Sequence, residues 1–227
     1  MNALNLIKSY DFFKPEEVKE RIHIIGCGSV GSSVAELLAR LGLEKFALYD
    51  FDKVEPKNIS NQMFRQNHIG ESKVDALVEM LCEVNPMIAG KGVRMEMKGY
   101  VAQKLSGYVF LCVDNIELRR KIADTNKDNP YIKAMFDFRT RLTDAQHYAS
   151  DWSEIKMVED FINSMNFTHE EAKAETPVSA CNTTLSVAPT IRIISSLGVA
   201  NFINFVKGEG LRKFIQIDAF GFVLDAF

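Results

Sequence analysis

The stretch Ile22-His23-Ile24-Ile25-Gly26-Cys27-Gly28-Ser29-Val30-Gly31 decides the fold, because an apolar run passes directly into a glycine-rich turn. Residues 21–25 predict a buried parallel strand. Residues 32–41 place valine and leucine at helical spacing, and Gly42 ends that helix. Residues 45–50 predict a second strand. Together they predict a βαβ unit of about 30 residues, the length of a nucleotide-binding crossover.

The glycines of this turn fit a phosphate-binding loop. Gly26 permits a tight turn, Gly28 allows the backbone to approach a pyrophosphate, and Gly31 lets the helix pack closely on the strand. The following helix presents free N–H groups to phosphate. Asp50, at the end of the second strand, suits recognition of ribose hydroxyls. We therefore expect a bound nucleotide here; the loop alone fits NAD, FAD or ATP.

The rest of the chain continues to alternate between strands and helices. We expect strands at 92–97, 108–113 and 131–136, a β segment at 139–148, and helices at 73–83, 117–126 and 182–206. Two short strands follow, at 214–217 and 222–224. This pattern predicts an α/β fold, a Rossmann-like, doubly wound, mostly parallel sheet with an antiparallel C-terminal extension.

The length favours a single domain over 1–227. We expect a nucleotide-binding half at 20–126 and a substrate and dimer half at 127–227, with a polar flap at about 150–178.

Composition narrows the class of protein. The net charge is -3, which argues against a nucleic-acid binder. No apolar run approaches the roughly 18 residues of a membrane span, so we expect no membrane association. The 4 cysteines form no CxxC pair, which disfavours a zinc site or a disulfide framework and favours a cytoplasmic protein.

Acidic and basic residues follow the other predicted strands. In a doubly wound sheet the carboxyl ends of the strands converge on the ligand, so Asp50, Lys73 and Asp114 should approach one pocket. A carboxylate beside polyphosphate is repulsive unless a metal lies between them, so Asp114 is a candidate Mg²⁺ ligand. Lys73 can neutralise charge that develops on phosphate oxygens. This set indicates ATP chemistry rather than hydride transfer.

The ordered motifs resemble a known family. Gly26-x-Gly28-x-x-Gly31, Asp50-Phe51-Asp52-x-Val54-x-x-x-Asn58, Gly70-x-x-Lys73 and Val113-Asp114-Asn115-x-x-x-Arg119 are similar to the ThiF/MoeB/HesA adenylyltransferases, relatives of the ubiquitin-activating enzymes. The resemblance is close over roughly 20–120 and looser over 180–208. It implies an enzyme that uses ATP and Mg²⁺ to convert the C-terminal carboxylate of a small ubiquitin-like or sulfur-carrier protein, or of a peptide, into an acyl-adenylate. It also implies a homodimer.

The resemblance assigns roles to individual residues. Asp50 would hold the ribose, Asn58 and Lys73 the phosphates, and Asp114 the metal. The expected nucleotide-binding set is Gly26, Gly28, Ser29, Gly31, Asp50, Asp52, Asn58, Lys73, Asp114 and Asn115. The expected catalytic set is Lys73, Asp114, Arg65 and Cys181.

The sequence departs from the family at two arginines. Asn61 occupies the position of an arginine in the family's N-x-x-R-Q motif, and the N-terminal segment that lends an arginine across the dimer is missing. Arg65, Arg139, Arg141 or a partner could supply the charge. The zinc cysteine pairs of many members are missing too, so the chain resembles a minimal branch.

Cys181 lies before the apolar stretch 187–189, where family members can carry a cysteine that forms a thioester or persulfide adduct. A buried, purely structural cysteine fits equally well. Two other functions stay open: an NAD-dependent oxidoreductase, and a catalytically weak nucleotide-binding scaffold.

Overall fold

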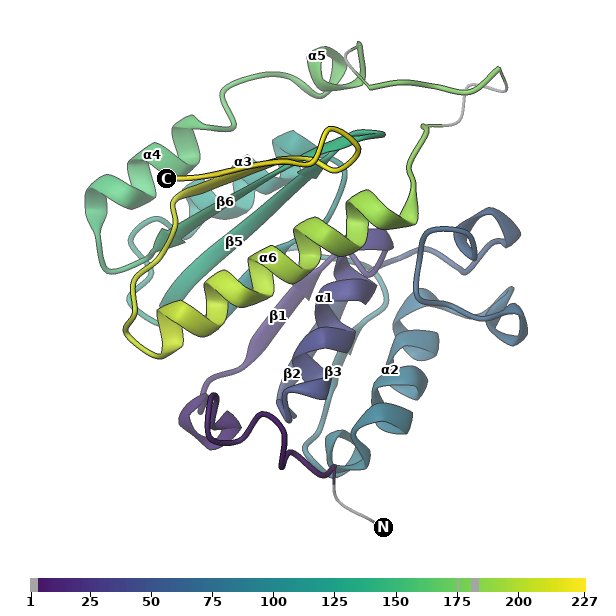
Figure 1. Ribbon diagram of the computed structural model, residues 1–227, viewed down its shortest axis with the longest axis vertical. Coiled ribbons are helices and arrows are strands. Elements are labelled where there is room, and N and C mark those ends of the chain that lie inside the picture. The colour runs from purple at the N-terminus through teal and green to yellow at the C-terminus, as the bar shows by residue number, and fades with distance from the viewer. Residues whose placement is uncertain (1–3, 175, 181–183) are drawn as a thin grey trace.

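The computed structural model describes residues 4–174, 176–180 and 184–227, and its centre is an eight-stranded sheet (Figure 1). The strand order is β3-β2-β1-β4-β5-β6-β7-β8. Strands β1 (Ile22–Ile25), β2 (Phe46–Tyr49), β3 (Arg94–Glu96), β4 (Gly107–Leu111) and β5 (Ile132–Thr140) run parallel. Strands β6 (Asp144–Asp151), β7 (Phe214–Asp218) and β8 (Val223–Ala226) continue the sheet antiparallel. The predicted α/β class with an antiparallel C-terminal extension is confirmed.

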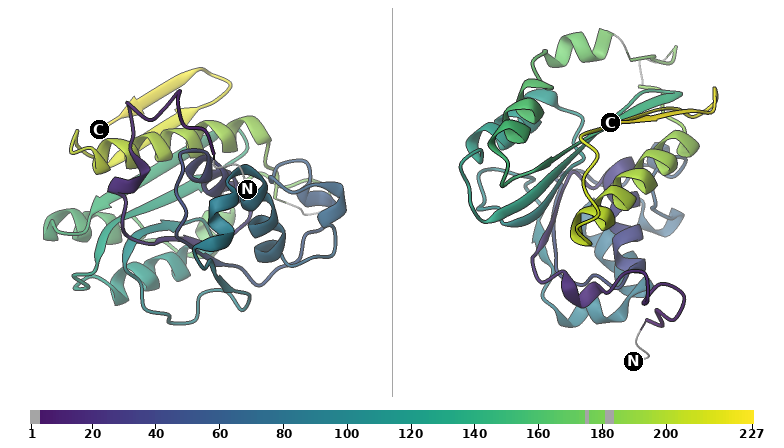
Figure 2. Two further views of the ribbon diagram at one scale, coloured as in Figure 1. Left: turned by 90° about the horizontal axis from the view of Figure 1, so that it is seen from below. Right: turned by 60° about the vertical axis from the view of Figure 1, so that its left-hand side comes forward.

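Helices cover both faces of the sheet (Figures 1 and 2). On one face, α1 (Ser29–Arg40), α2 (Lys73–Val84) and α6 (Ala188–Val206) share a core with alternate residues of β1, β2, β4 and β5. On the other face lie α3 (Ile116–Thr125) and α4 (Ile155–Asn163). Helix α5 (His169–Ala174) carries no buried residue. Because β1, β2 and β4 are covered on both faces, every residue in them is buried.

Short 3₁₀ helices fill the connections: η1 (Pro15–Glu17), η2 (Pro56–Asn58), η3 (Gln66–His68) and η4 (Pro86–Gly90). Two of them lie in the loop between β2 and α2, where the sequence predicts only a polar loop.

Helix α6 starts later than its sequence pattern predicts. Its first residue is Ala188 rather than Asn182, and Val187 is the extended N-cap. Pro189 explains the start, because proline is accommodated in the first turn of a helix. Helix α1, in contrast, begins at Ser29 rather than at Ser32, directly after its N-cap Gly28. The predicted flap at 150–178 begins in β6 and contains α4 and α5.

One ring cluster ties the two halves of the chain together. Phe202 of α6 contacts Phe13, and its ring lies 5.0–5.9 Å from those of Tyr108, Phe110 and Phe136. By length and composition α6 could cross a membrane, and among the described helices it alone reaches that threshold. Half of its apolar window is buried within the protein, against α1, β5 and β6.

Candidate functional site

The glycine loop joins β1 to α1, and its three glycines meet different surroundings. Gly26 has φ +94°, and a Cβ there would lie 2.8 Å from the carbonyl of Cys112. A Cβ on Gly31 would lie 1.8 Å from the carbonyl oxygen of Gly26. Gly28, in contrast, faces open space, with no heavy atom within 4 Å of an added Cβ. Two glycines therefore permit internal packing, while the third leaves a space beside the N-terminus of α1 that a phosphate could occupy.

Asp50 fixes the other side of this loop. Its Oδ2 accepts a hydrogen bond from the N–H of Cys27 over 2.7 Å, and its Oδ1 accepts one from the N–H of Asp52 over 2.9 Å. Burial raises the pKa of Asp50 above its ordinary value, while these N–H donors act in the opposite direction. Each carboxylate oxygen has a second lone pair, so both can still accept a ribose hydroxyl.

Asp52 and Lys73 close the base of the loop between β2 and α2. Lys73 is the first residue of α2, and its Nζ donates to Asp52 Oδ2 over 2.7 Å. Its backbone N–H donates to the carbonyl of Asp52 over 3.0 Å. Lys73 is buried whereas half of the Asp52 side chain is exposed. Asp52, whose charge water partly screens, thus holds the Lys73 ammonium group where its charge acts on Asp50.

Two other predicted residues of this loop lie differently. Asn58 is buried, and its Oδ1 accepts from the N–H of Glu55, which leaves its amide NH₂ as a donor. Arg65 forms an ion pair with Glu83 near the C-terminus of α2. Ten residues separate Glu83 from Lys73, roughly 15 Å along a helix, so the structure does not bring the Arg65 guanidinium to Lys73. The catalytic role expected of Arg65 stays a prediction that this geometry does not support.

The Asp114 loop follows β4. Asn115 is the N-cap of α3, and its Oδ1 accepts from the N–H of Leu118 over 2.8 Å. Asp114 is exposed, and its carboxylate makes no hydrogen bond or ion pair with any residue that the structure describes. A free carboxylate oxygen is what a hard cation such as Mg²⁺ requires.

A buried guanidinium supports that loop from beneath. Arg119 donates from Nε to the carbonyl of Val113 over 2.6 Å and from Nη1 to Asp137 Oδ1 over 2.8 Å. The backbone next to Asp114 is therefore fixed by an ion pair rather than by loop contacts alone. The sequence motif includes Arg119, but nothing in its pattern identifies Asp137 as the partner.

Arg139 extends the same network. Its Nε donates to Asp137 Oδ2 over 2.7 Å, and its Nη1 donates to the carbonyl of Ser164 over 2.8 Å. Its guanidinium also stacks 4.0 Å above the ring of Tyr148. These partners occupy Arg139, so it is not available at the glycine loop. Arg141 lies beyond it, in the turn between β5 and β6.

The thiols that the structure describes differ from reactive cysteines. Burial raises the pKa of Cys27 and of Cys112 well above the ordinary value, and it also raises that of Cys82. Protonated thiols are poor nucleophiles, in keeping with structural roles. Cys181 lies outside the described residues, so its predicted role stays a prediction.

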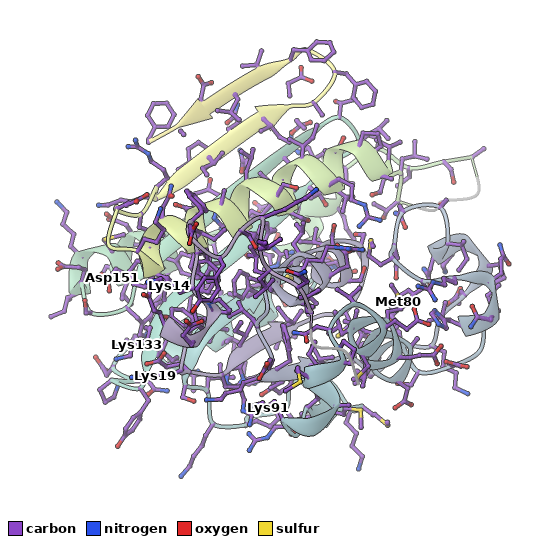
Figure 3. The ribbon with its side chains drawn as sticks, turned by 60° about the horizontal axis from the view of Figure 1, so that its bottom comes forward. Lys14, Lys19, Met80, Lys91, Lys133 and Asp151 are labelled. Atoms are coloured by element: carbon purple, nitrogen blue, oxygen red, sulfur yellow. The ribbon has the colours of Figure 1, made fainter. Side chains whose placement is uncertain are left out.

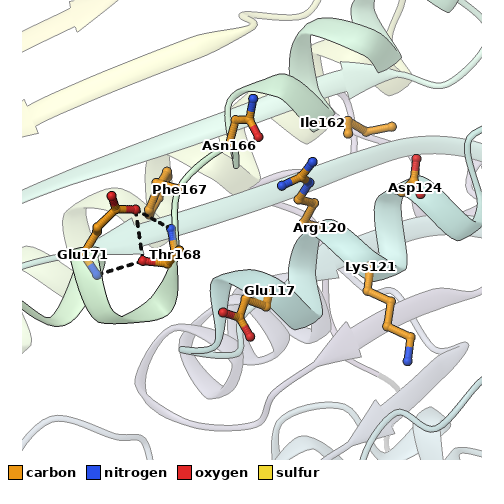
Figure 4. A pocket seen from close by; sticks show the side chains of 9 residues that line it. All are labelled: Glu117, Arg120, Lys121, Asp124, Ile162, Asn166, Phe167, Thr168 and Glu171. Atoms are coloured by element: carbon orange, nitrogen blue, oxygen red, sulfur yellow. Dashed lines mark hydrogen bonds between the residues drawn. The ribbon is translucent and has the colours of Figure 1, made fainter.

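A groove of about 560 Å³ lies beside this site, between α3 and residues 162–171 (Figure 4). It does not include the glycine loop, but it begins at Glu117, in the first turn after Asp114-Asn115. Phe167 lines it, and Arg120 projects from α3 toward the segment that carries Ile162 and Asn166. A second hollow, of about 370 Å³, lies at the amino ends of the strands, where Figure 3 shows Lys19 and Lys91.

The described residues contain no cluster of three or more His, Cys, Asp or Glu side chains able to hold a metal by themselves.

One residue near the glycine loop escapes sequence reasoning. Arg192 of α6 donates from Nη1 to Ser33 Oγ of α1 over 2.7 Å. It is the one charged residue between Ala188 and Val206, and a lone charge in an apolar helix is the signal that could have found it.

The fold and this site define an α/β protein with a glycine-rich strand–loop–helix unit at the carboxyl ends of its parallel strands, an arrangement typical of nucleotide-binding folds. The model of the ThiF family matches residues 16–225, and the chain belongs to that family.

Curated relatives include ubiquitin-like modifier-activating enzyme 5 of Arabidopsis thaliana, 33% identical over 127 residues, which cover 47% of this chain and 30% of the relative. The Caenorhabditis elegans protein of that name is 34% identical over 122 residues, which cover 47% of this chain and 29% of the relative. The chain thus spans about a third of the length of the curated relatives it matches.

Among solved structures, Escherichia coli MccB with ATP is similar, with a TM-score of 0.70 at 16% identity. The match covers 94% of this chain and 65% of the MccB chain. A complex of MccB with MccA-N7isoASN has a TM-score of 0.71 at 16% identity, covering 94% and 66%. At this identity the likeness shows the fold.

Proposed function

We propose that the protein is an ATP-dependent adenylyltransferase. It activates the C-terminal carboxylate of a small ubiquitin-like or sulfur-carrier protein, or of a peptide, as an acyl-adenylate. The observation that carries the proposal is the open face of Gly28, which lies in the loop that Asp50 holds. Lys73 binds Asp52 beside Asp50, and the backbone of Cys112 and Val113, which precedes Asp114, lies against Gly26. Membership of the ThiF family and the matches to ubiquitin-like modifier-activating enzymes support it.

The chemistry requires little beyond positioning. A carboxylate oxygen of the substrate attacks the α-phosphorus of ATP, the bond to the β-phosphate oxygen breaks, and pyrophosphate leaves with the electron pair. The substrate is already ionised at neutral pH, so no base is needed. Alignment and charge stabilisation by Lys73 then supply the rate.

Mg²⁺ is the cofactor that the donor set fits. Asp114 would hold it, and Arg119 fixes the backbone beside that carboxylate. When bound, the ion would neutralise the phosphate oxygens as charge shifts onto the leaving pyrophosphate.

The groove beside α3 is where the substrate's C-terminal segment would lie. It begins beside the Asp114 loop, and both cations and acids line it, namely Arg120 and Lys121 together with Glu117, Asp124 and Glu171. A tail that entered along Phe167 would bring its carboxylate toward the metal-binding side of the nucleotide. Homodimerisation and a cytoplasmic location belong to the proposal and need separate tests, by light scattering and by fractionation.

The experiment is ATP–pyrophosphate exchange in the presence of small proteins that end in Gly-Gly. The matched control is the same proteins with an amidated C-terminus, which removes the attacking carboxylate and nothing else. Exchange with the free carboxylate alone supports the proposal. ATP binding without exchange, for every carboxylate tried, would support the scaffold alternative. Binding of NAD but not of Mg-ATP would support an oxidoreductase, which the family assignment does not favour.

A further inference from the structure

Helix α6 places a guanidinium beside the nucleotide loop. Arg192 is the fifth residue of α6, Ser33 is the fifth residue of α1, and the two side chains are hydrogen-bonded over 2.7 Å. The N-terminal turns of the two helices therefore lie side by side, as Figure 1 also shows. Helical side chains lean toward the N-terminus, so this contact lies over the first turn of α1, which begins after Gly28.

The partners of Arg192 do not account for its charge. Ser33 Oγ is its one hydrogen-bond partner among the residues that the structure describes, although a guanidinium carries five N–H donors. Glu36 is the acid whose charge acts on the pKa of Arg192, but its carboxylate forms an ion pair with Arg40 instead. Arg192 is half-buried, and burial lowers its pKa, with Glu36 acting weakly in the opposite direction. Charges that are removed from water are normally paired with an opposite charge. Among the described residues no acid pairs with Arg192, so this arginine lacks a counter-anion.

The backbone beneath Arg192 is well anchored. Thr190 Oγ1 donates to the carbonyl of Leu142 over 2.9 Å, and Ile191 and Ile194 are buried in the core. The backbone of Arg192 is therefore fixed beside α1, and its side chain would leave Ser33 by a change of rotamer to bind a group at the N-terminal turn that follows Gly28. A phosphate group, which a guanidinium can bind through two parallel N–H bonds, is a suitable anion at that place.

We propose that Arg192 is a phosphate-binding residue of the nucleotide site, contributed by α6 from the C-terminal half of the chain. The inference rests on the proposed function, because it requires a nucleotide at the glycine loop. Arg192 would supply a positive charge to the phosphates. Arg65 and Arg139 do not supply it in this structure, because Arg65 pairs with Glu83 and Arg139 pairs with Asp137.

The test compares the affinities for ATP and for adenosine by titration calorimetry in the presence of MgCl₂. Arg192→Met should weaken ATP binding about tenfold or more, the usual effect of losing a charged hydrogen bond, and leave adenosine binding unchanged. Arg192→Lys should retain part of the ATP affinity because it keeps the charge without the two-pronged geometry. The control is Arg40→Met, an exposed arginine in the last turn of α1, which should change neither affinity.

The outcomes separate the two proposals. If wild type binds ATP and Arg192→Met binds it equally well, or loses ATP and adenosine equally, Arg192 is not a phosphate ligand although the function stands. If wild type binds no ATP, both proposals fail. Should Arg192→Met not fold, the same comparison is made with Arg192→Lys, and an unchanged ratio of ATP to adenosine affinity in that variant overturns the inference.

Discussion

Arg119 donates to Asp137 across 2.8 Å in the interior of the protein, where Asp137 is wholly inaccessible to solvent. Although burial raises the pKa of Asp137, the guanidinium groups of Arg119 and Arg139 together hold it below its ordinary value. This carboxylate therefore stays ionised and joins two separate parts of the molecule, the Asp114 loop and the segment after α4.

Replacing Asp137 by Asn should destabilise the protein strongly. Two buried guanidinium groups would lose their counter-charge, which typically costs about 3–5 kcal/mol. Urea unfolding followed by circular dichroism measures the loss. The control is Asp144→Asn, an exposed partner of Arg141 whose loss should cost at most about 1 kcal/mol. Equal losses in the two variants would contradict the idea that burial makes the Asp137 network important.

Two glycines of the nucleotide loop should respond in opposite ways to substitution by alanine. Gly31→Ala forces a Cβ against the carbonyl oxygen of Gly26, so we expect a loss of several kcal/mol in stability, as in other overpacked sites. Gly28→Ala meets no protein atom, and its φ of -74° lies outside the left-handed region, although glycine adopts the ψ of -144° more readily than alanine. It should therefore cost much less stability than Gly31→Ala, and it should bind ATP more weakly. A Gly28→Ala protein with undiminished ATP affinity would place the phosphates elsewhere.

Lys73→Met should weaken ATP binding and slow ATP–pyrophosphate exchange. The positive charge of the buried Lys73 ammonium group lowers the pKa of Asp50. Loss of a charged partner typically costs roughly 1.5–3 kcal/mol, or about tenfold or more in affinity. Lys57→Met is the matched control, since that lysine is exposed and pairs with Glu55 on the surface. If the two variants behave alike, Lys73 does not contact the nucleotide.

Asp114→Asn should raise the Mg²⁺ concentration needed for half-maximal exchange. The amide keeps the size of the side chain but removes the negative charge that a hard cation prefers. ATP affinity measured without Mg²⁺ should stay the same or increase, since the carboxylate repels phosphate. Asp128→Asn, exposed beyond the other end of α3, serves as the control. An unchanged Mg²⁺ requirement in Asp114→Asn would remove this residue from the proposed metal site.

Stability should fall as the pH is lowered from about 6.5 to about 4. His147 lies fully buried between the carbonyl of Asp137 and the amide of Asn201, and burial lowers its pKa from 6.5 to about 4. In that window the unfolded imidazole binds a proton that the folded one does not, so each such histidine removes up to about 1.4 kcal/mol per pH unit. His23, whose pKa burial also lowers to about 4, contributes in the same direction.

Urea titrations at several pH values measure this slope. In His147→Gln the slope should decrease by up to about 1.4 kcal/mol per pH unit, the contribution of one proton, because glutamine does not titrate. Glutamine also retains a hydrogen-bond donor and an acceptor. An identical slope in wild type and variant would show that folding leaves the pKa of His147 unchanged.

The sequence predicted the parts of the molecule that depend on local pattern. The strand, glycine turn and helix at 22–40 follow from short-range periodicity, and the position of Asp50 beside the glycine loop follows from the geometry of parallel sheets. That Asp50, Lys73 and Asp114 share one pocket stays a prediction. Arg65 and Arg192 show where this reasoning ends. The sequence names Arg65 as a substitute for the missing arginine, but its guanidinium pairs with Glu83. The Arg192 contact joins residues 159 positions apart, which no local pattern encodes.

The packing of α6 on α1 has a consequence for how the chain is made. Phe202 completes a ring cluster whose other members come from the first 136 residues, and Arg192 reaches back to Ser33. During synthesis, α1 can pack on β1 and α2 early, but the part of its surface that α6 covers stays exposed until residues 188–206 have left the ribosome. The segment that carries the glycine loop is thus translated first, yet its core closes among the last, and a fragment that ends before Ala188 should emerge as a chaperone client rather than as a small nucleotide-binding domain.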